Sequence, residues 1–205
     1  MPTSVLVVGA GLAGARTVSA LRELGFTGSI HLLGAEGLAP YDRPPLSKHL
    51  LNRTTPVLLS DDLGIDVVAL ADTYLDRPAI WLDLTRARPT VGTTDGELSA
   101  DALVIATGSA PLLPGGWHGA MILLTTADAA LLREQLHPDA HLACVGAGWL
   151  GSEVASVAAS AGLRVTVLEA GSSPLEASLG PSLGPHFARW FDAAGVELRA
   201  GTPVS

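Results

Sequence analysis

The sequence contains a single cysteine, Cys144, among its 205 residues. One cysteine excludes an internal disulfide, a Cys-x-x-Cys redox pair and a cysteine-rich zinc site. Basic residues are also few, because 12 Lys and Arg stand against 20 Asp and Glu, which gives a net charge of −8. This balance argues against a nucleic-acid-binding protein, which needs a basic surface.

Long apolar runs are missing as well. No run approaches the roughly 18 residues of a membrane span, and no basic stretch precedes the first apolar run as it does in a signal peptide. The composition is nevertheless apolar, with 48% hydrophobic and only 16% charged residues. Such a chain has enough apolar surface to bury a core. We therefore predict a soluble, cytoplasmic, globular protein that does not bind membranes.

What the sequence does contain is an internal repeat. Residues 5–36 and 142–169 each show an apolar strand, a Gly-x-Gly-x-x-Gly turn, a helix-compatible segment and a second apolar strand that leads to an acid. The turn glycines are Gly9, Gly11 and Gly14 in the first repeat, and Gly146, Gly148 and Gly151 in the second. Each repeat predicts a βαβ unit of a parallel sheet. The expected fold is α/β, with two tandem Rossmann-like, doubly wound domains at residues 1–110 and 111–205.

The glycine turns have a chemical purpose. The first glycine allows a sharp turn, the second lets a pyrophosphate approach the backbone, and the third lets helix and strand pack closely. An acid about 20 residues further on accepts the ribose hydroxyls of adenosine, and Glu36 and Glu169 stand at that distance. Two such units predict two dinucleotide sites, whereas the alternative is two chance glycine turns in an alanine-rich protein. Ala170 and Gly171 follow Glu169 directly, with no Arg or Lys placed to receive a 2′-phosphate, which favours NADH over NADPH.

The chain between the repeats predicts further elements. Residues 81–98 contain Arg-Pro, Thr-Thr and Asp-Gly breaks between short β-prone runs, so we expect antiparallel hairpins inserted before a strand at 102–106. A helix is expected at 125–136, with Asp128 near its start. Within the second repeat, Cys144 falls in a predicted buried strand, where inert packing is the expected role.

Three segments, two between the repeats and one within the second repeat, point to a family. PYDRPPLSKHL occupies residues 40–50, DALVIATGSAP occupies residues 101–111, and GSEVA follows the second glycine turn at residues 151–155. Together with the glycine turns, these segments resemble the FAD-dependent, NADH-dependent ferredoxin reductases of the pyridine nucleotide-disulfide oxidoreductase superfamily. The resemblance runs from Val5 to about Val204, and RPPLSK is its most specific part.

The resemblance implies a role for each matching residue. The ADP half of FAD would be held by Gly9, Gly11, Leu12, Ala13, Gly14 and Glu36. Arg43, Lys48, Thr107 and Gly108 would lie along the FAD, with Lys48 near the redox-active edge of the flavin. NADH would be held by Gly146, Gly148, Trp149, Leu150, Gly151 and Glu169. Glu153 would meet Lys48, since a cation stabilises the reduced, anionic ring and a carboxylate fixes that cation in place.

The resemblance also implies a reaction and its partner. Without a redox cysteine pair, a disulfide reductase is excluded, and electrons would leave the flavin directly for an external acceptor. The resemblance implies that NADH reduces the flavin and that the acceptor is a ferredoxin-type iron–sulfur protein. Family members continue beyond this length, so both domains are expected to be incomplete. A segment that returns to the first domain and a C-terminal domain over the flavin would be missing. The alternatives are a flavoprotein of the NADH oxidase or nitrite reductase kind, and a truncated, non-catalytic chain that binds nucleotide.

Overall fold

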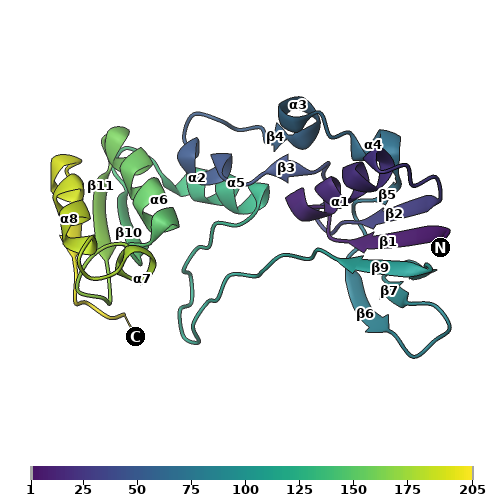
Figure 1. Ribbon diagram of the computed structural model, residues 1–205. Helices are drawn as coiled ribbons and strands as arrows, with labels where there is room; N and C mark the ends of the chain where they lie inside the picture. Colours follow the sequence, from purple (N-terminus) through teal and green to yellow (C-terminus); the bar gives the residue numbers. More distant parts are fainter. Residues whose placement is uncertain (1, 205) are drawn as a thin grey trace. The chain divides into compact units, whose positions relative to one another are not determined.

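Each of the two sequence repeats forms its own parallel β-sheet in the computed structural model, which describes residues 2–204 (Figure 1). The first compact unit contains the residues up to Asp42 together with Val57–Ala110. The second unit contains Arg43–Pro56 and the residues from Pro111 onward. Our expected domains divide the chain only once, between residues 110 and 111. The structure differs in grouping Arg43–Pro56 with the second unit.

The first unit is built on a parallel sheet with the strand order β5-β2-β1-β9. Its strands are β1 (Ser4–Val8), β2 (Ser29–Leu33), β5 (Asp72–Tyr74) and β9 (Ala102–Ile105). Both faces of the sheet are buried. Val5 and Val7 of β1 pack with the helical side, while Leu6 and Val8 pack toward the other face, as the alternation of side chains along a strand requires.

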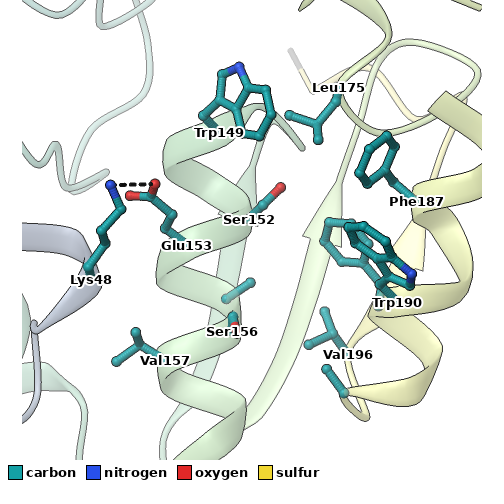
Figure 2. A pocket seen from close by; sticks show the side chains of 13 residues that line it. Lys48, Trp149, Ser152, Glu153, Ser156, Val157, Leu175, Phe187, Trp190 and Val196 are labelled. Atoms are coloured by element: carbon teal, nitrogen blue, oxygen red, sulfur yellow. Dashed lines mark ion pairs between the residues drawn. The ribbon is translucent and has the colours of Figure 1, made fainter. Parts of the chain in front are cut away.

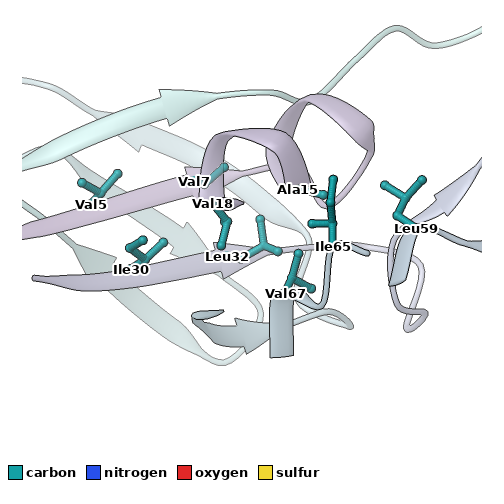
Figure 3. Close-up of a cluster of buried hydrophobic side chains, with 9 residues drawn as sticks. All are labelled: Val5, Val7, Ala15, Val18, Ile30, Leu32, Leu59, Ile65 and Val67. Atoms are coloured by element: carbon teal, nitrogen blue, oxygen red, sulfur yellow. The ribbon is translucent and has the colours of Figure 1, made fainter. Parts of the chain in front are cut away.

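Helix α1 (Leu12–Glu23) and the short helices α3 (Leu59–Leu63) and α4 (Val67–Leu70) provide the helical side of this core. Figure 3 shows the cluster, in which Ala15 and Val18 of α1 meet Ile30 and Leu32 of the sheet. A small two-stranded sheet pairs β3 (Tyr41–Asp42) with β4 (Val57–Leu58). These residues flank the segment that belongs to the second unit.

The opposite face of the first sheet is covered by an antiparallel sheet. Its strands are β6 (Ala79–Asp83), β7 (Thr90–Thr93) and β8 (Gly96–Ser99). Val91 of β7 and Ala100 pack against Leu6, Val8 and Leu33. The expected hairpins between residues 81 and 98 are therefore confirmed, and they stand immediately before β9.

Asp101 ties the start of the chain to the strand that closes the first sheet. Its carboxylate accepts hydrogen bonds from the Thr3 hydroxyl and N–H, both at 2.7 Å, and from the Ser4 N–H at 3.1 Å, and it pairs with Arg88 at 3.0 Å. The Thr3 hydrogen bonds, ahead of the Arg88 charge, lower the pKa of Asp101 from 3.8 to about 2. The ionised carboxylate is therefore part of the native sheet.

We expect Asp101→Asn to reduce the dependence of stability on acid. The folded pKa lies below the unfolded one, so the contribution of Asp101 is present above pH 3.8 and is lost as the pH falls toward 2. Urea midpoints at pH 5, 3 and 2 should fall less steeply in the variant than in the parent chain, whereas Asp139→Asn, at an exposed acid, should keep the parent slope. Parallel curves for Asp101→Asn and the parent would contradict this assignment.

The second unit repeats the strand–turn–helix–strand order around a three-stranded parallel sheet, β10-β11-β12. Its strands are β10 (His141–Val145), β11 (Arg164–Leu168) and β12 (Glu197–Arg199). Helices α6 (Trp149–Ser160) and α8 (Gly184–Ala193) pack on one face, where Ala155, Ala158 and Phe191 meet Val165 and Val167. The remaining helices are α2 (Pro45–Lys48), α5 (Thr126–Gln135) and α7 (Glu176–Leu179).

Helix α5 begins with a capping box, since the Thr125 hydroxyl accepts from the Asp128 N–H and the Asp128 carboxylate accepts from the Thr125 N–H. The expected helix and the position of Asp128 are confirmed. No helix formed by residues 2–204 has both the length and the apolar character needed to cross a membrane.

Candidate functional site

The first glycine turn connects β1 to α1. Gly9 has a φ of +113°, and a Cβ there would lie 2.1 Å from the carbonyl oxygen of Ala106 at the end of β9. Only a residue without a side chain fits at this position, because the ends of β1 and β9 approach each other closely here. Thr107 follows Ala106, and its backbone nitrogen would lie 2.9 Å from the same Cβ, so the structure brings Thr107 beside this turn. Gly108 is the next residue of the chain and has a φ of +71°.

Gly11 has a different environment. It caps the N-terminus of α1 without a side-chain hydrogen bond, and an added Cβ would meet no protein atom within 4 Å. Gly148 shows the same two features at the N-terminus of α6. The first N–H groups of both helices therefore face open space, which is the arrangement that binds a phosphate anion.

A cavity of about 710 Å³ opens beside the second turn. The predicted nucleotide residues on its wall are Gly146, Gly148, Trp149, Leu150 and Gly151. Trp149 is 56% exposed, so it is not a core residue. The turn thus combines an uncapped helix N-terminus with space for a ligand, and its residues fit the pyrophosphate of a dinucleotide.

Glu169 is held by the backbone of the second turn. Its Oε2 accepts a hydrogen bond from the Ala147 N–H at 2.6 Å, and its Oε1 accepts from the Gly171 N–H at 2.7 Å. The Ala147 carbonyl in turn accepts from the N–H of Leu175 at 2.9 Å. Leu175 itself adopts a φ of 58°, a left-handed conformation that is rare for leucine. The hydrogen bonds of Glu169 and of the Ala147 carbonyl thus fix the conformation of the turn without a ligand.

Glu169→Ala is expected to lower the unfolding free energy of the second unit by about 1–3 kcal/mol, because it leaves the N–H of the buried Ala147 without its acceptor. Chemical unfolding followed by the fluorescence of Trp149 and Trp190 checks this value. Glu134→Ala, at an exposed glutamate on α5, serves as the control and should change stability by less than about 0.5 kcal/mol. Equal stability of the two variants would show that Glu169 does not support the turn.

Glu36 lies in the first unit and is held differently. It is exposed, and its Oε2 accepts a hydrogen bond from the hydroxyl of buried Tyr41 at 2.5 Å. The glycine spacing predicts the position of both acids but neither of these partners, Tyr41 and Ala147. The hydrogen bonds depend on loop geometry that the spacing of glycines and acids does not encode.

The third part of the site is an ion pair between α2 and α6. Lys48 Nζ lies 3.5 Å from Glu153 Oε1, as Figure 2 shows. The two side chains are 55% and 28% exposed, so the pair is open to solvent on the lysine side. Lys48 is the only lysine of the whole chain. The structure thus brings together two residues, Lys48 and Glu153, whose pairing in the sequence is implied only by the family resemblance.

A cavity of about 470 Å³ lies next to this pair, between α6 and α8. Its apolar wall is formed largely by Trp149, Leu175, Phe187, Trp190 and Val196 (Figure 2). The Ser152 hydroxyl, also on this wall, is buried without a hydrogen-bond partner in the described chain.

Arg43 lies at the start of the segment that carries Lys48. Its guanidinium donates to the carbonyl of Leu124, which precedes the capping box of α5. Burial raises the pKa of Asp128, but the hydrogen bonds from Thr125 and Leu124 and the nearby Arg43 outweigh it, so that the pKa lies below its ordinary value. Arg43 and Lys48 therefore both belong to the second unit, whereas the first glycine turn and Glu36 belong to the first.

Cys144 lies in a strand, β10, as predicted, but this strand alternates between exposed and half-buried residues and is not the buried strand that was expected. Cys144 is half-buried, and desolvation raises the pKa of its thiol to about 11. The thiolate is therefore scarce at neutral pH. Residues 2–204 contain no group of three or more His, Cys, Asp or Glu side chains arranged to hold a metal ion.

These features place the chain in a family. The family model described as pyridine nucleotide-disulphide oxidoreductase matches residues 3–205, and the chain belongs to that family.

Two relatives have names that are more specific than the description of the family model. The chain is 38% identical to the ferredoxin–NAD(+) reductase subunit of the benzene 1,2-dioxygenase system of Pseudomonas putida, covering 100% of this chain and 51% of that protein. It is 34% identical to putidaredoxin reductase of the same organism, covering 98% of this chain and 50% of the relative. The chain thus spans about half the length of the curated relatives it matches.

Solved structures agree with this assignment. The crystal structure of Fdr9 matches with a TM-score of 0.88 and 43% identity, over 98% of this chain and 50% of that one. The reductase in a covalent complex with putidaredoxin matches with a TM-score of 0.86 and 31% identity, over 99% of this chain and 51% of that one. The expected α/β fold and the family resemblance are confirmed.

Proposed function

We propose that this chain supplies the FAD-binding and NADH-binding turns of an oxidoreductase that passes electrons from NADH through flavin to a ferredoxin-type iron–sulfur protein. The observation that carries the proposal is the pair of helix N-termini that no side chain caps. Gly11 precedes one helix and Gly148 the other, and open space lies beside both glycines. An acid, Glu36 or Glu169, follows each helix after the next strand. The named relatives are reductases of ferredoxins and of putidaredoxin, which supports the same acceptor class.

Each group of residues has a part in this reaction. The N–H groups at the start of α1 would hold the pyrophosphate of FAD, with Glu36 accepting from its ribose hydroxyls. The start of α6 and Glu169 would do the same for NADH. Glu169 disfavours NADPH because a carboxylate repels a 2′-phosphate. When bound, FAD supplies the redox chemistry, accepting a hydride and releasing single electrons.

Lys48 and Glu153 have an electrostatic task. An ammonium group beside the flavin stabilises the negative charge of the reduced ring, and the Glu153 carboxylate keeps that ammonium in place. Arg43 would lie along the flavin in the same segment. Because NADH is supplied in the cytoplasm, the proposed reaction implies a cytoplasmic protein.

The visible spectrum of the purified chain, before and after anaerobic NADH, tests the proposal. Bound FAD is expected to give a yellow protein that NADH bleaches, and Glu169→Ala should weaken the response to NADH without removing the colour. Adding a small iron–sulfur ferredoxin should then reoxidise the flavin faster than oxygen does. A chain that remains colourless after addition of FAD would contradict the proposal.

A further inference from the structure

Adjacent residues of α2 contact both oxygens of the Glu153 carboxylate. The Ser47 hydroxyl lies 2.5 Å from Oε2, and Lys48 Nζ lies 3.5 Å from Oε1. Ser47 is only 3% exposed, so its hydroxyl has no access to bulk water. One carboxylate oxygen is thus fixed in the protein interior while the other faces the ammonium group.

The hydroxyl proton of Ser47 has two acceptors in reach. Glu153 Oε2 lies at 2.5 Å, and the carbonyl oxygen of Pro44 lies at 3.2 Å. A hydroxyl carries one proton, and a carboxylate at this short distance is the stronger acceptor. The proton therefore lies toward Glu153, where it fixes the orientation of the carboxylate.

Ser47 is itself held in place by the second unit. Leu50 is fully buried against Ala129, Leu132 and Val154, and the Arg133 side chain donates to the Leu50 carbonyl at 2.8 Å and to the Arg53 carbonyl at 2.9 Å. These contacts anchor the end of α2 and the loop that follows it. The position of the Ser47 hydroxyl is thus determined by packing on α5 and α6, and does not depend on Lys48.

We propose that Ser47 is a positioning residue for the Lys48–Glu153 pair. The Ser47 hydroxyl fixes Oε2 of Glu153 and thereby orients Oε1 toward Lys48. The ammonium group of Lys48 is then held beside α6 in one position. The inference rests on the proposed function for the purpose of the pair, because the pair's task is to place a cation beside the flavin. The hydroxyl acts through Glu153 and contacts no cofactor in this role.

The single lysine makes a direct test possible. A chain labelled with ¹³C-lysine gives one side-chain Cε–Hε signal, that of Lys48, with no other lysine to overlap it. Glu153→Gln removes the charge partner and is expected to move this signal toward its position in the urea-unfolded chain. Ser47→Ala is expected to move it in the same direction by at least about half as much, while Ser47→Thr, which keeps the hydroxyl, retains the parent position.

Ser152→Ala is the matched control, because it deletes a buried serine hydroxyl on α6 that has no hydrogen-bond partner in the described chain. It should leave the Lys48 signal unmoved. The urea unfolding curve of each variant shows whether the chain is folded under the conditions of the NMR measurement. Only folded variants are compared, so a change in the Lys48 signal cannot result from unfolding. A Ser47→Ala signal at the parent position, or no response to Glu153→Gln, overturns the proposal.

The experiment uses the chain without nucleotide, which separates it from the proposed function. Failure to bind FAD contradicts the proposed function but does not change the Lys48 signal. Conversely, an unmoved signal in Ser47→Ala contradicts the positioning role of Ser47. It does not affect the proposed function, which the reduction of the flavin by NADH tests separately.

Discussion

Gly11→Ala and Gly148→Ala are expected to weaken nucleotide binding by about 10- to 100-fold while changing the unfolding free energy little. Neither added Cβ would touch a protein atom, because both positions border the open space in front of a helix N-terminus. In a bound complex the same Cβ would stand where the pyrophosphate approaches the backbone, and crowding of this kind costs about 1–3 kcal/mol.

Gly14→Ala and Gly151→Ala should show the opposite pattern. A Cβ at Gly14 would lie 1.8 Å from the carbonyl oxygen of Gly9, and at Gly151 it would lie 2.1 Å from that of Gly146. Both neighbours are backbone atoms, so the turn itself has to move. We expect each of these substitutions to lower the unfolding free energy by about 1–3 kcal/mol or more.

Urea unfolding of the four variants, together with titration by FAD and by NADH, measures both effects. Each variant serves as the experimental control for the other. Gly11→Ala should weaken FAD binding and leave NADH binding unchanged, and Gly148→Ala should do the reverse. Unchanged FAD affinity in Gly11→Ala would mean that the first turn does not hold the pyrophosphate. A destabilised Gly11→Ala chain would mean that the open space is absent in solution.

The sequence predicts the elements of this fold well because glycine spacing and apolar runs are local signals. The repeats predicted at residues 5–36 and 142–169 contain β1, α1 and β2, and β10, α6 and β11, in the expected order, and β1 and β10 each begin one residue before the predicted start. The hairpins before β9 and the capping box of α5 depend on equally local turn and cap chemistry.

Contacts between distant segments could not be predicted in the same way. Nothing in RPPLSKHL indicates that Leu50 packs on Leu132 and Val154, so the segment 43–56 was expected to belong to the first domain. The hydrogen bond from the Ala147 N–H to Glu169 is a second example, since the spacing that predicts an acid for a ribose does not predict that this acid also accepts from the backbone. Such pairings depend on which surfaces meet in three dimensions, and a single sequence carries no direct record of them.

The membership of residues 43–56 has a testable consequence for stability. Leu50 lies in sequence between β2 and β5 of the first unit, yet it is fully buried among side chains of α5 and α6. Leu50→Ala is therefore expected to destabilise the second unit by about 2–5 kcal/mol, the usual cost of emptying a buried leucine site. Its carbonyl would still accept from Arg133, so the loss measures packing alone.

Amide hydrogen exchange on the full chain distinguishes the two units, because local stability is reported segment by segment. In Leu50→Ala, protection should fall in β10, α5 and α6 and persist in β1 and β2. Leu59→Ala is the matched control, since Leu59 is the next fully buried leucine along the chain but packs in the core of the first unit with Ile65 and Val67. It should remove protection from β1 and β2 instead. If both variants lose protection in the same strands, residues 43–56 do not fold as part of the second unit, and Lys48 is not held to α6 by the packing described above.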